Sequence, residues 1–477
     1  MKSHLYLNTK RLFTRVTPII LGIFALCNHT LQAQLPLPPL FADRMVLQQK
    51  SEAPIWGWGN ASETIQIVGS WSPQDTTKVV VASDGRWKTT LKTGSAGGPF
   101  TIHIMGSTSI NLQQVMLGEV WLCSGQSNME WQPHQGLSNQ KEEIQSANYP
   151  DIRIFTVAKR GADSPQNNCE GKWEPCTPEV MSRSSAVAYF FSRRLQEILQ
   201  VPVGIIVSAW GGTPAEVWVP KELVDNSPIF SENKPTKTYP WWPIESGRLY
   251  NQMIHPLVPF QIAGTIWYQG ESNQDHYGSY NTLMKELINA WRKDFGHAFP
   301  FYFVQIAPHT YNAPNHAPAF LREQQERTLH ETTHTGMIII SDLVNDVKNI
   351  HPINKQDVGL RLANMALAKN YAQDIQEYQS PLYKSMQIVK NKIIIEFEHA
   401  DNGLICSQKR ITGLKIAGQD GIWLDANATI KGNTLIVSAP GLKNPAKVSY
   451  CFDEATIGNL FSKGNLPVAP FRTDREF

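Results

Sequence analysis

Residues 122–131 read Leu122-Cys123-Ser124-Gly125-Gln126-Ser127-Asn128-Met129-Glu130-Trp131, and the rest of the chain is organised around them. The apolar run 119–123 has the composition of a buried strand, and Ser127 follows soon after it ends. Ligands of open α/β sheets bind beyond the carboxyl ends of the strands, and glycine lets a backbone approach a reacting group closely. Ser127 is therefore a candidate nucleophile. The alternative is a polar turn that caps the next segment, because short Gly-x-Ser matches often occur by chance.

The middle of the chain, from about residue 118 to 374, alternates apolar runs with helical patterns. The spacing predicts strands over 152–157, 203–207, 263–268, 301–306 and 337–340, and helices over 185–199, 282–295, 319–330 and 356–371. Near-continuous apolar strands that alternate with amphipathic helices indicate an α/β fold with a parallel sheet covered on both faces.

Polar residues follow three of these strands and complete a set that suits acyl transfer. Gly211 and Gly212 follow strand 203–207, Asn273 follows strand 263–268, and a loop after strand 337–340 leads to His351. Ser127 would attack an ester carbonyl while His351 takes its proton and later returns it to the leaving group. The oxyanion would be held by the Ser127 N–H, one of the two glycine N–H groups and the Asn273 amide.

Each supporting residue has a plainer explanation. Gly211-Gly212 also suits a strand-to-helix turn, and Asn273 also suits an Asx turn. The chain has 13 histidines, and an arbitrary histidine is more often a surface or packing residue than a base. His351 stands out because it follows the last predicted strand, whereas His255 precedes a strand and would lie at the wrong edge of the sheet.

Three blocks, taken in this order, resemble the sialate O-acetylesterase family of SGNH-type carbohydrate esterases. They are residues 125–131 (Gly-Gln-Ser-Asn-Met-Glu-Trp), 266–273 (Ile-Trp-Tyr-Gln-Gly-Glu-Ser-Asn) and 350–352 (Ile-His-Pro). The resemblance extends over nearly the whole mature chain. It implies a three-layer α/β/α domain and a serine esterase that removes O-acetyl groups from sugars, with O-acetylated sialic acid as the expected substrate. It also implies that Gly212 and Asn273 complete the oxyanion hole. Met129 stands where the α/β-hydrolase elbow has glycine, which favours the SGNH arrangement.

The acid partner of His351 departs from the family pattern. Many SGNH hydrolases carry Asp three residues before the catalytic His, but this chain has Lys348 at that position. The candidate acids are Glu271, in the same block as Asn273, and Asp342 or Asp346 in the His351 loop; Glu271 is preferred. A Ser127–His351 dyad without a carboxylate is the alternative.

The catalytic domain is predicted at residues 118–384. The two segments that flank it show short β-type runs broken by turn residues. They predict an N-terminal β domain over 34–117 and a C-terminal β domain over 385–477, both sandwich-like. The last segment, 467–473, is expected to return to the core domain. Four tryptophans of the first flank are expected mostly to pack the sandwich rather than to form a carbohydrate platform, because aromatic residues dominate cores: Trp56, Trp58, Trp71 and Trp87.

Residues 1–33 have the layout of a signal peptide: basic residues, an apolar run from Val16 to Cys27, and a final alanine. The apolar run is shorter than the ~20 residues that span a bilayer. We therefore expect a secreted or periplasmic protein, lysosomal or extracellular in a eukaryote, with no membrane span.

Composition sets further limits. With 42% hydrophobic residues, 18% charged residues and a net charge of +2, the chain is neither disordered nor a binder of nucleic acid. No cofactor or metal is expected, because neither His-Glu-x-x-His nor paired Cys-x-x-Cys spacing occurs. The mature chain keeps an odd number of cysteines, so at least one thiol is free: Cys123, Cys169, Cys176, Cys406 and Cys451. Cys169 with Cys176 and Cys406 with Cys451 are candidate bridges, and the pairing stays open, as does the oligomeric state.

The substrate is less visible in the sequence. Several residues could wall a sugar site by stacking on a pyranose: Glu130, Trp131, Trp210, Trp218, Trp241, Trp242 and Tyr268. The carboxylate of sialic acid requires an Arg or Lys, and Arg248 is a candidate. Without a cation near Ser127, a neutral acetylated sugar such as xylan becomes the better substrate. The rival from another class is a non-catalytic carbohydrate-binding protein.

Overall fold

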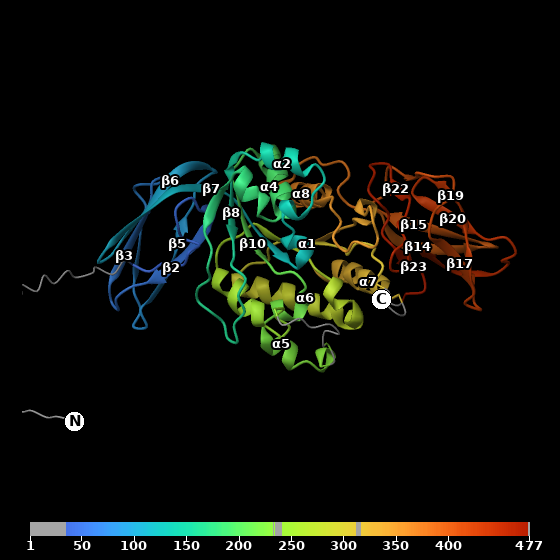
Figure 1. Ribbon diagram of the computed structural model, residues 1–477, viewed down its shortest axis with the longest axis horizontal. Helices are drawn as coiled ribbons and strands as arrows, with labels where there is room; N and C mark the ends of the chain where they lie inside the picture. Colours follow the sequence, from blue (N-terminus) through green and yellow to red (C-terminus); the bar gives the residue numbers. More distant parts are fainter. Residues whose placement is uncertain (1–34, 232, 234–240, 312–315, 476–477) are drawn as a thin grey trace, which may run out of the picture.

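The computed structural model describes residues 35–231, 233, 241–311 and 316–475. The predicted signal peptide, residues 1–33, lies outside the described residues. Along the longest axis, a β unit at the N-terminal end is followed by a central α/β unit and then by a second β unit (Figure 1). The predicted order of fold types is therefore confirmed.

The central unit is built on a seven-strand path of mostly parallel strands in the order β13-β12-β11-β7-β10-β8-β9. Only β9 runs antiparallel to its neighbour. The strands are β7 (Ser109–Gly125), β8 (Tyr149–Thr156), β9 (Trp173–Cys176), β10 (Val203–Ala209), β11 (Gly264–Tyr268), β12 (Phe301–Val304) and β13 (Thr335–Ile338). Five of them were predicted within a few residues. Almost every residue of β10, β11 and β12 is buried, as a sheet covered on both faces requires.

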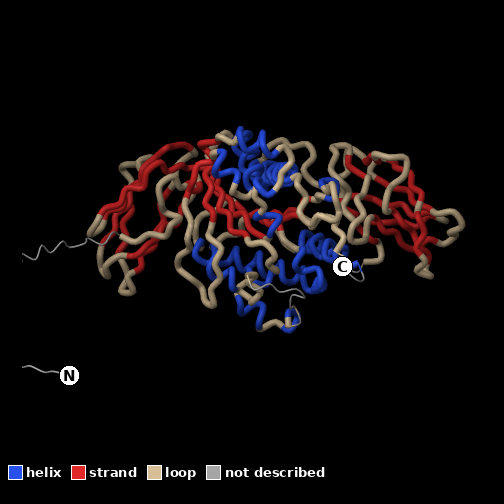
Figure 2. Tube along the Cα trace, in the orientation of Figure 1, coloured by secondary structure: helices blue, strands red, loops and turns tan. Residues whose placement is uncertain are grey.

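Helices cover both faces of this sheet (Figures 1 and 2). On one face lie α2 (Gln140–Ser146), α4 (Ala186–Leu199) and α8 (Lys355–Tyr371); on the other lie α6 (Tyr277–Phe295) and α7 (Ala317–Glu331). The Ser185 side chain caps α4 by accepting from the Ala188 N–H, and the Asn354 side chain caps α8 in the same way. Successive β7 residues point to opposite faces: Trp121 packs with the α4 and α8 side chains, whereas Leu122 packs with those of α6.

Strand β7 joins the N-terminal β unit to the central unit. Its first half pairs antiparallel with β6 (Gly97–Met105), and its second half pairs parallel with β10 and β11. The predicted domain boundary between residues 117 and 118 thus falls inside one continuous strand. The stretch that contains Ser127 therefore follows a strand that is paired in both units.

The rest of the N-terminal unit contains β1 (Val46–Gln48), β2 (Glu52–Trp58), β3 (Thr64–Gly69), β4 (Thr76–Val80) and β5 (Arg86–Lys92). Strands β2 and β5 form a separate two-stranded sheet. The four tryptophans fall into two groups by burial. Trp87 is 2% exposed and packs the core, whereas Trp56, Trp58 and Trp71 are only partly buried. Trp56 and Trp71 still pack against the core cluster that contains Trp87, so the expectation of core packing is confirmed for three of the four tryptophans.

Two four-stranded sheets form the C-terminal unit, in the orders β14-β15-β20-β19 and β18-β17-β21-β23. Their strands are β14 (Leu382–Val389), β15 (Lys392–Glu398), β17 (Leu414–Gly418), β18 (Trp423–Asp425), β19 (Asn427–Lys431), β20 (Thr434–Ser438), β21 (Pro445–Tyr450) and β23 (Phe471–Arg472). Buried residues of both sheets share one apolar cluster. The chain end returns to the central unit, because Arg472 binds Glu323 of α7 at 2.9 and 3.0 Å.

Both candidate disulfide bridges are absent from the described residues, where all five cysteines are free thiols. Over the same residues, no helix is long and apolar enough to cross a membrane. No group of three or more His, Cys, Asp or Glu side chains in the described part of the chain could hold a metal ion.

We predict that Gly125→Ala lowers the free energy of unfolding by about 2 kcal/mol, the cost of a strained backbone conformation. Gly125 has φ +137°, and a Cβ there would lie 2.2 Å from the Tyr268 carbonyl oxygen. Chemical denaturation measures the change. Gly278→Ala in α6 is the control, because its Cβ would meet nothing within 4 Å. Equal stability of Gly125→Ala and wild type would contradict this account of the β7–β11 contact.

Candidate active site

Ser127 and His351 meet at the carboxyl edge of the central sheet. Ser127 is the first residue of the short helix α1 (Ser127–Glu130), directly after β7, and His351 lies in the loop that precedes α8. The Ser127 Oγ and His351 Nε2 atoms are 2.9 Å apart. This is the hydrogen-bond distance that a nucleophile and its general base require.

Gln126 ties the serine loop to the loop that follows β11. Its backbone N–H donates to the Tyr268 carbonyl at 3.0 Å. Its side-chain Oε1 accepts from the Gly270 and Ser272 N–H groups, both at 3.3 Å. The first two of the three sequence blocks that carry the family resemblance are thus bonded to each other.

Asn128 joins the same two loops to the histidine loop. Its Nδ2 donates to Glu271 Oε1 at 2.6 Å and to the Ile350 carbonyl at 3.1 Å. Its Oδ1 accepts from Lys355 Nζ. Asn128 is fully buried, and this side-chain amide therefore has partners for both of its N–H groups and for its oxygen. Asn128 belongs to the motif at residues 125–131, but no role was predicted for it from the sequence.

The Glu271 carboxylate does not reach the His351 ring. Its Oε1 binds Asn128, and its Oε2 has no hydrogen-bond partner among the described residues. The other two candidate acids are also engaged elsewhere: Asp342 binds Arg361 at 2.6 and 2.7 Å, and Asp346 accepts from the Lys348 N–H at 2.9 Å. Within the described ranges, Ser127 is the one hydrogen-bond partner of the His351 ring.

The His351 ring is held by stacking and by its backbone. Its ring centroid lies 4.5 Å from that of Trp131, with 25° between the planes. Trp131 is in turn fixed by a 2.6 Å hydrogen bond from its Nε1 to the Gly136 carbonyl. The His351 N–H donates to Asn349 Oδ1 at 3.0 Å. Trp131 therefore sets the plane of the His351 ring, and Asn349 holds the His351 backbone.

Burial sets the charges of this site. Desolvation, helped by the nearby Lys355 ammonium and by His309, lowers the pKa of His351 to about 4. Burial lowers the pKa of Lys355 to about 7, although Glu271 opposes that shift. Burial also raises the pKa of Glu271. The His351 imidazole is thus neutral at pH 7 and able to accept a proton.

The oxyanion donors can be distinguished by their partners. The Gly211 N–H donates to Glu130 Oε2 at 2.6 Å, so the Gly212 N–H is the better candidate of the pair. Gly212 has φ +77° and packs against Trp242, whose ring leaves no space for a Cβ. A glycine is therefore required at this position.

The Asn273 side chain is 2% exposed and firmly held. Its Oδ1 accepts from Gln269 Nε2 at 2.6 Å and from the Ala215 N–H at 2.9 Å. Its Nδ2 donates one hydrogen to Glu216 Oε2 at 2.8 Å. An amide nitrogen carries two hydrogens, so the second has no partner among the described residues; Asn273 itself is not among the described residues that line the cavity next to Ser127.

Ser127 and His351 open into a cavity of about 730 Å³. Five of the residues that sequence reasoning proposed as a sugar wall line it: Glu130, Trp131, Trp210, Trp241 and Trp242. Trp218 and Tyr268 are instead fully buried in the core. Arg248 is not among the lining residues and pairs with Asp163 and Glu245.

Among the described residues that line the cavity is a lysine, Lys159, that was not predicted. Lys159 lies 5.8 Å above the Trp210 ring and pairs with Glu130. It stands in a loop after β8 with no motif around it, so the sequence carried no signal for it. The described lining also contains Glu271 and Asp275, and its charge is therefore not predominantly positive.

Comparison with known proteins agrees with this geometry. A family model described as carbohydrate esterase, sialic acid-specific acetylesterase, matches residues 117–373. The rat sialate O-acetylesterase is 30% identical over 413 residues, which cover 73% of this chain and 76% of that protein. The human sialate O-acetylesterase is 29% identical over 401 residues, covering 74% and 75%.

Among solved structures, a carbohydrate acetylesterase from Xanthomonas citri is similar over almost the whole chain. It has a TM-score of 0.85 and 33% sequence identity, and the match covers 93% of this chain and 100% of that one. The family model, the relatives and this structure all agree with the resemblance noted in the sequence. The chain therefore belongs to the sialic acid-specific acetylesterase family of carbohydrate esterases, and it is a carboxylic ester hydrolase.

Proposed function

We propose that this protein is a serine esterase that removes O-acetyl groups from sugars, with O-acetylated sialic acid as its substrate. The observation that carries the proposal is the 2.9 Å contact between Ser127 Oγ and His351 Nε2 at the floor of an aromatic-lined cavity. A hydroxyl paired with a neutral imidazole has the chemistry of a nucleophile and its base.

The reaction proceeds in two halves. Ser127 Oγ attacks the acetyl carbonyl and passes its proton to His351 Nε2, which then protonates the departing sugar oxygen. The acetyl group remains on Ser127 until water, deprotonated by His351, releases it as acetate. The Ser127 and Gly212 N–H groups and the Asn273 Nδ2 stabilise the oxyanion of both tetrahedral intermediates; one such donor is typically worth ~3 kcal/mol.

His351 works in this proposal without a carboxylate partner. Because Nε2 must accept the serine proton, the ring proton resides on Nδ1. Trp131 fixes the plane of the ring, and Asn128 fixes the loop through the Ile350 carbonyl. Glu271 acts on the loop through Asn128. No contact between Glu271 and the His351 ring supports the role of acid partner that was preferred from the sequence.

The substrate assignment depends on the family description, on the names of the relatives and on Lys159 in the cavity. One observation favours a second candidate, a neutral acetylated sugar such as xylan. Lys159 shares its charge with Glu130, which weakens its attraction for a substrate carboxylate. Both candidates use the same catalytic groups.

We expect wild type to release acetate from O-acetylated sialic acid, and Ser127→Ala and His351→Ala to lose this activity by a factor on the order of 10⁴–10⁶, as in other serine hydrolases. Acetylated xylo-oligosaccharides are assayed in parallel, and the higher kcat/KM identifies the substrate class.

Ser146→Ala and His103→Ala, at exposed positions on other elements, are the matched controls and should keep full activity. Release of acetate from neither sugar, or an active Ser127→Ala, would contradict the proposal and favour a non-catalytic carbohydrate-binding protein.

The pH dependence provides a separate test. The base must be neutral, so kcat/KM for an activated acetyl ester should stay level below pH 7 and fall to half near pH 4, the pKa of His351. Lys355→Met removes a charge that lowers this pKa, so the midpoint should rise. It should stay below 6.5, because desolvation, the larger cause, remains.

Lys369→Met is the control, since Lys369 also lies in α8, but it is exposed and its Nζ donates to the Thr335 carbonyl. A wild-type midpoint near 6.5, or equal midpoints in the two variants, would refute the electrostatic role of Lys355.

A further inference from the structure

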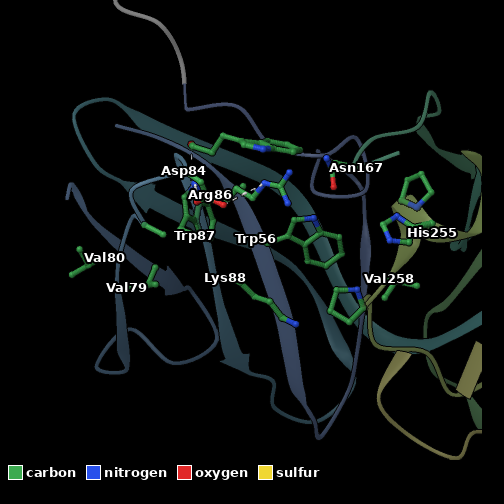
Figure 3. A pocket seen from close by; sticks show the side chains of 15 residues that line it. Trp56, Val79, Val80, Asp84, Arg86, Trp87, Lys88, Asn167, His255 and Val258 are labelled. Carbon is green, nitrogen blue, oxygen red and sulfur yellow. Dashed lines mark hydrogen bonds and ion pairs between the residues drawn. The ribbon is translucent and has the colours of Figure 1, made fainter. Parts of the chain in front are cut away.

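A second cavity, of about 470 Å³, lies where the N-terminal β unit meets the central unit. One wall comes from the two-stranded sheet β2–β5, and the other comes from residues 255–259 and Asn167 (Figure 3). None of its described lining residues also lines the cavity above Ser127. The acyl-transfer chemistry therefore leaves this second cavity without a role.

The sheet presents two tryptophans and two cations to this cavity. Strands β2 and β5 run antiparallel, with Trp56 opposite Lys88 and Trp58 opposite Arg86. Residues directly opposite each other point to the same face of a sheet, so the four side chains form two aromatic–cation pairs side by side. The neighbouring residues Ile55 and Trp87 alternate with these side chains along the strands and are 1% and 2% exposed, although Trp87 still contributes to the cavity wall.

The two tryptophans are only partly covered. Trp56 is positioned by an edge contact with Phe41, at 4.7 Å between ring centroids. Trp58 is positioned through its backbone, because its carbonyl accepts from Trp87 Nε1 at 3.2 Å. Within the described residues, neither indole N–H has a hydrogen-bond partner. Each tryptophan therefore keeps part of its ring and its N–H for a ligand.

The cations of this cavity are also available. Lys88 forms no ion pair with any described residue. Arg86 lies 3.8 Å from Asp84, with both side chains more than half exposed, and such pairs hold little free energy. On the opposite wall the ring of His255 is fixed by a 2.8 Å hydrogen bond between its Nδ1 and the Gln166 carbonyl. The cavity thus combines rigid apolar walls with free positive charge.

Sugars that carry a carboxylate match this combination. The C–H faces of a pyranose pack on tryptophan rings, and a carboxylate is bound by Arg and Lys. Asp84 and Asn167 can accept from and donate to ring hydroxyls. Sites of this kind, with aromatic walls and a few polar groups, occur preferentially at domain interfaces.

We propose that this cavity is an accessory binding site for the acidic sugar of a glycan, either a sialic acid or a uronic acid. It would hold the glycan chain to the enzyme away from Ser127. The proposal goes beyond the esterase function, because it concerns binding by residues that play no part in acetate release.

The test uses calorimetric titration of the Ser127→Ala protein with two matched pairs of probes. Sialyllactose is compared with lactose, and glucuronosyl xylotetraose with xylotetraose, so that each pair differs only by its acidic sugar. At least tenfold tighter binding of one acidic probe than of its neutral parent is expected, and the probe that shows it identifies the source of the carboxylate.

A second substitution in the Ser127→Ala protein, either Trp58→Ala or Lys88→Gln, should weaken that binding at least tenfold. The matched controls Trp423→Ala and Lys78→Gln, exposed in the C-terminal unit and on β4, should leave it unchanged. Melting temperatures verify that each variant is folded. Equal binding of acidic and neutral probes, or undiminished binding in both cavity variants, would overturn the proposal.

The esterase assay is independent of this result. With Ser127 intact, Trp58→Ala and Lys88→Gln should hydrolyse a small activated acetyl ester at the wild-type rate, because neither residue lines the cavity above Ser127. If the wild type showed no esterase activity, the proposed function would be contradicted, and the binding result would be judged by itself.

Discussion

The side-chain amide of Asn128 is the contact on which the arrangement of the site depends. It is fully buried and binds Glu271, the Ile350 carbonyl and Lys355 together. These partners lie in the loop after β11, in the histidine loop and at the start of α8. An amide with every hydrogen-bonding group satisfied has no alternative orientation, since a flip would place its oxygen against two acceptors. Its position therefore fixes Ser127 relative to His351.

Lys355 adds an electrostatic constraint to this geometry. A fully buried ammonium is costly to desolvate, and here it has Asn128 as hydrogen-bond partner and the faces of Trp131 and Tyr268 at 5.7 and 5.5 Å. Burial drives both Lys355 and Glu271 towards their neutral forms. Whatever charge Lys355 retains disfavours a second cation on His351, which helps to keep the imidazole neutral.

Much of the fold could be predicted from sequence because the buried strands and amphipathic helices have strong periodicities. Strand β5 has a weak sequence signal, because Arg86, Lys88 and the threonines between Trp87 and Leu91 conceal its alternation. The continuity of β7 was not predicted, for a different reason. The sequence pattern changes where β7 passes from the N-terminal unit to the central unit, and such a change resembles a domain boundary even when one strand continues through it. Helix α6 begins at Tyr277, five residues before the predicted start. Its first turn was not predicted, because it contains Gly278 and Ser279, which are weak helix formers.

At the site, Ser127 and His351 were predicted because each follows a strand end and belongs to a family motif. The contacts of Glu271 could not be predicted, because a sequence does not show which way a side chain turns within a loop. Lys355 carried no signal, since a lysine at a helix start is normally solvated. We propose that His351 serves as base without a carboxylate partner, held by its stacking on Trp131 and by the Asn128 network. The most direct measurement is kcat/KM of Glu271→Gln on an activated acetyl ester. We expect a loss of no more than about tenfold, because the amide can still accept from Asn128; a loss of about 10⁴-fold in a folded protein, the cost of removing a true triad acid, would show that Glu271 is that acid.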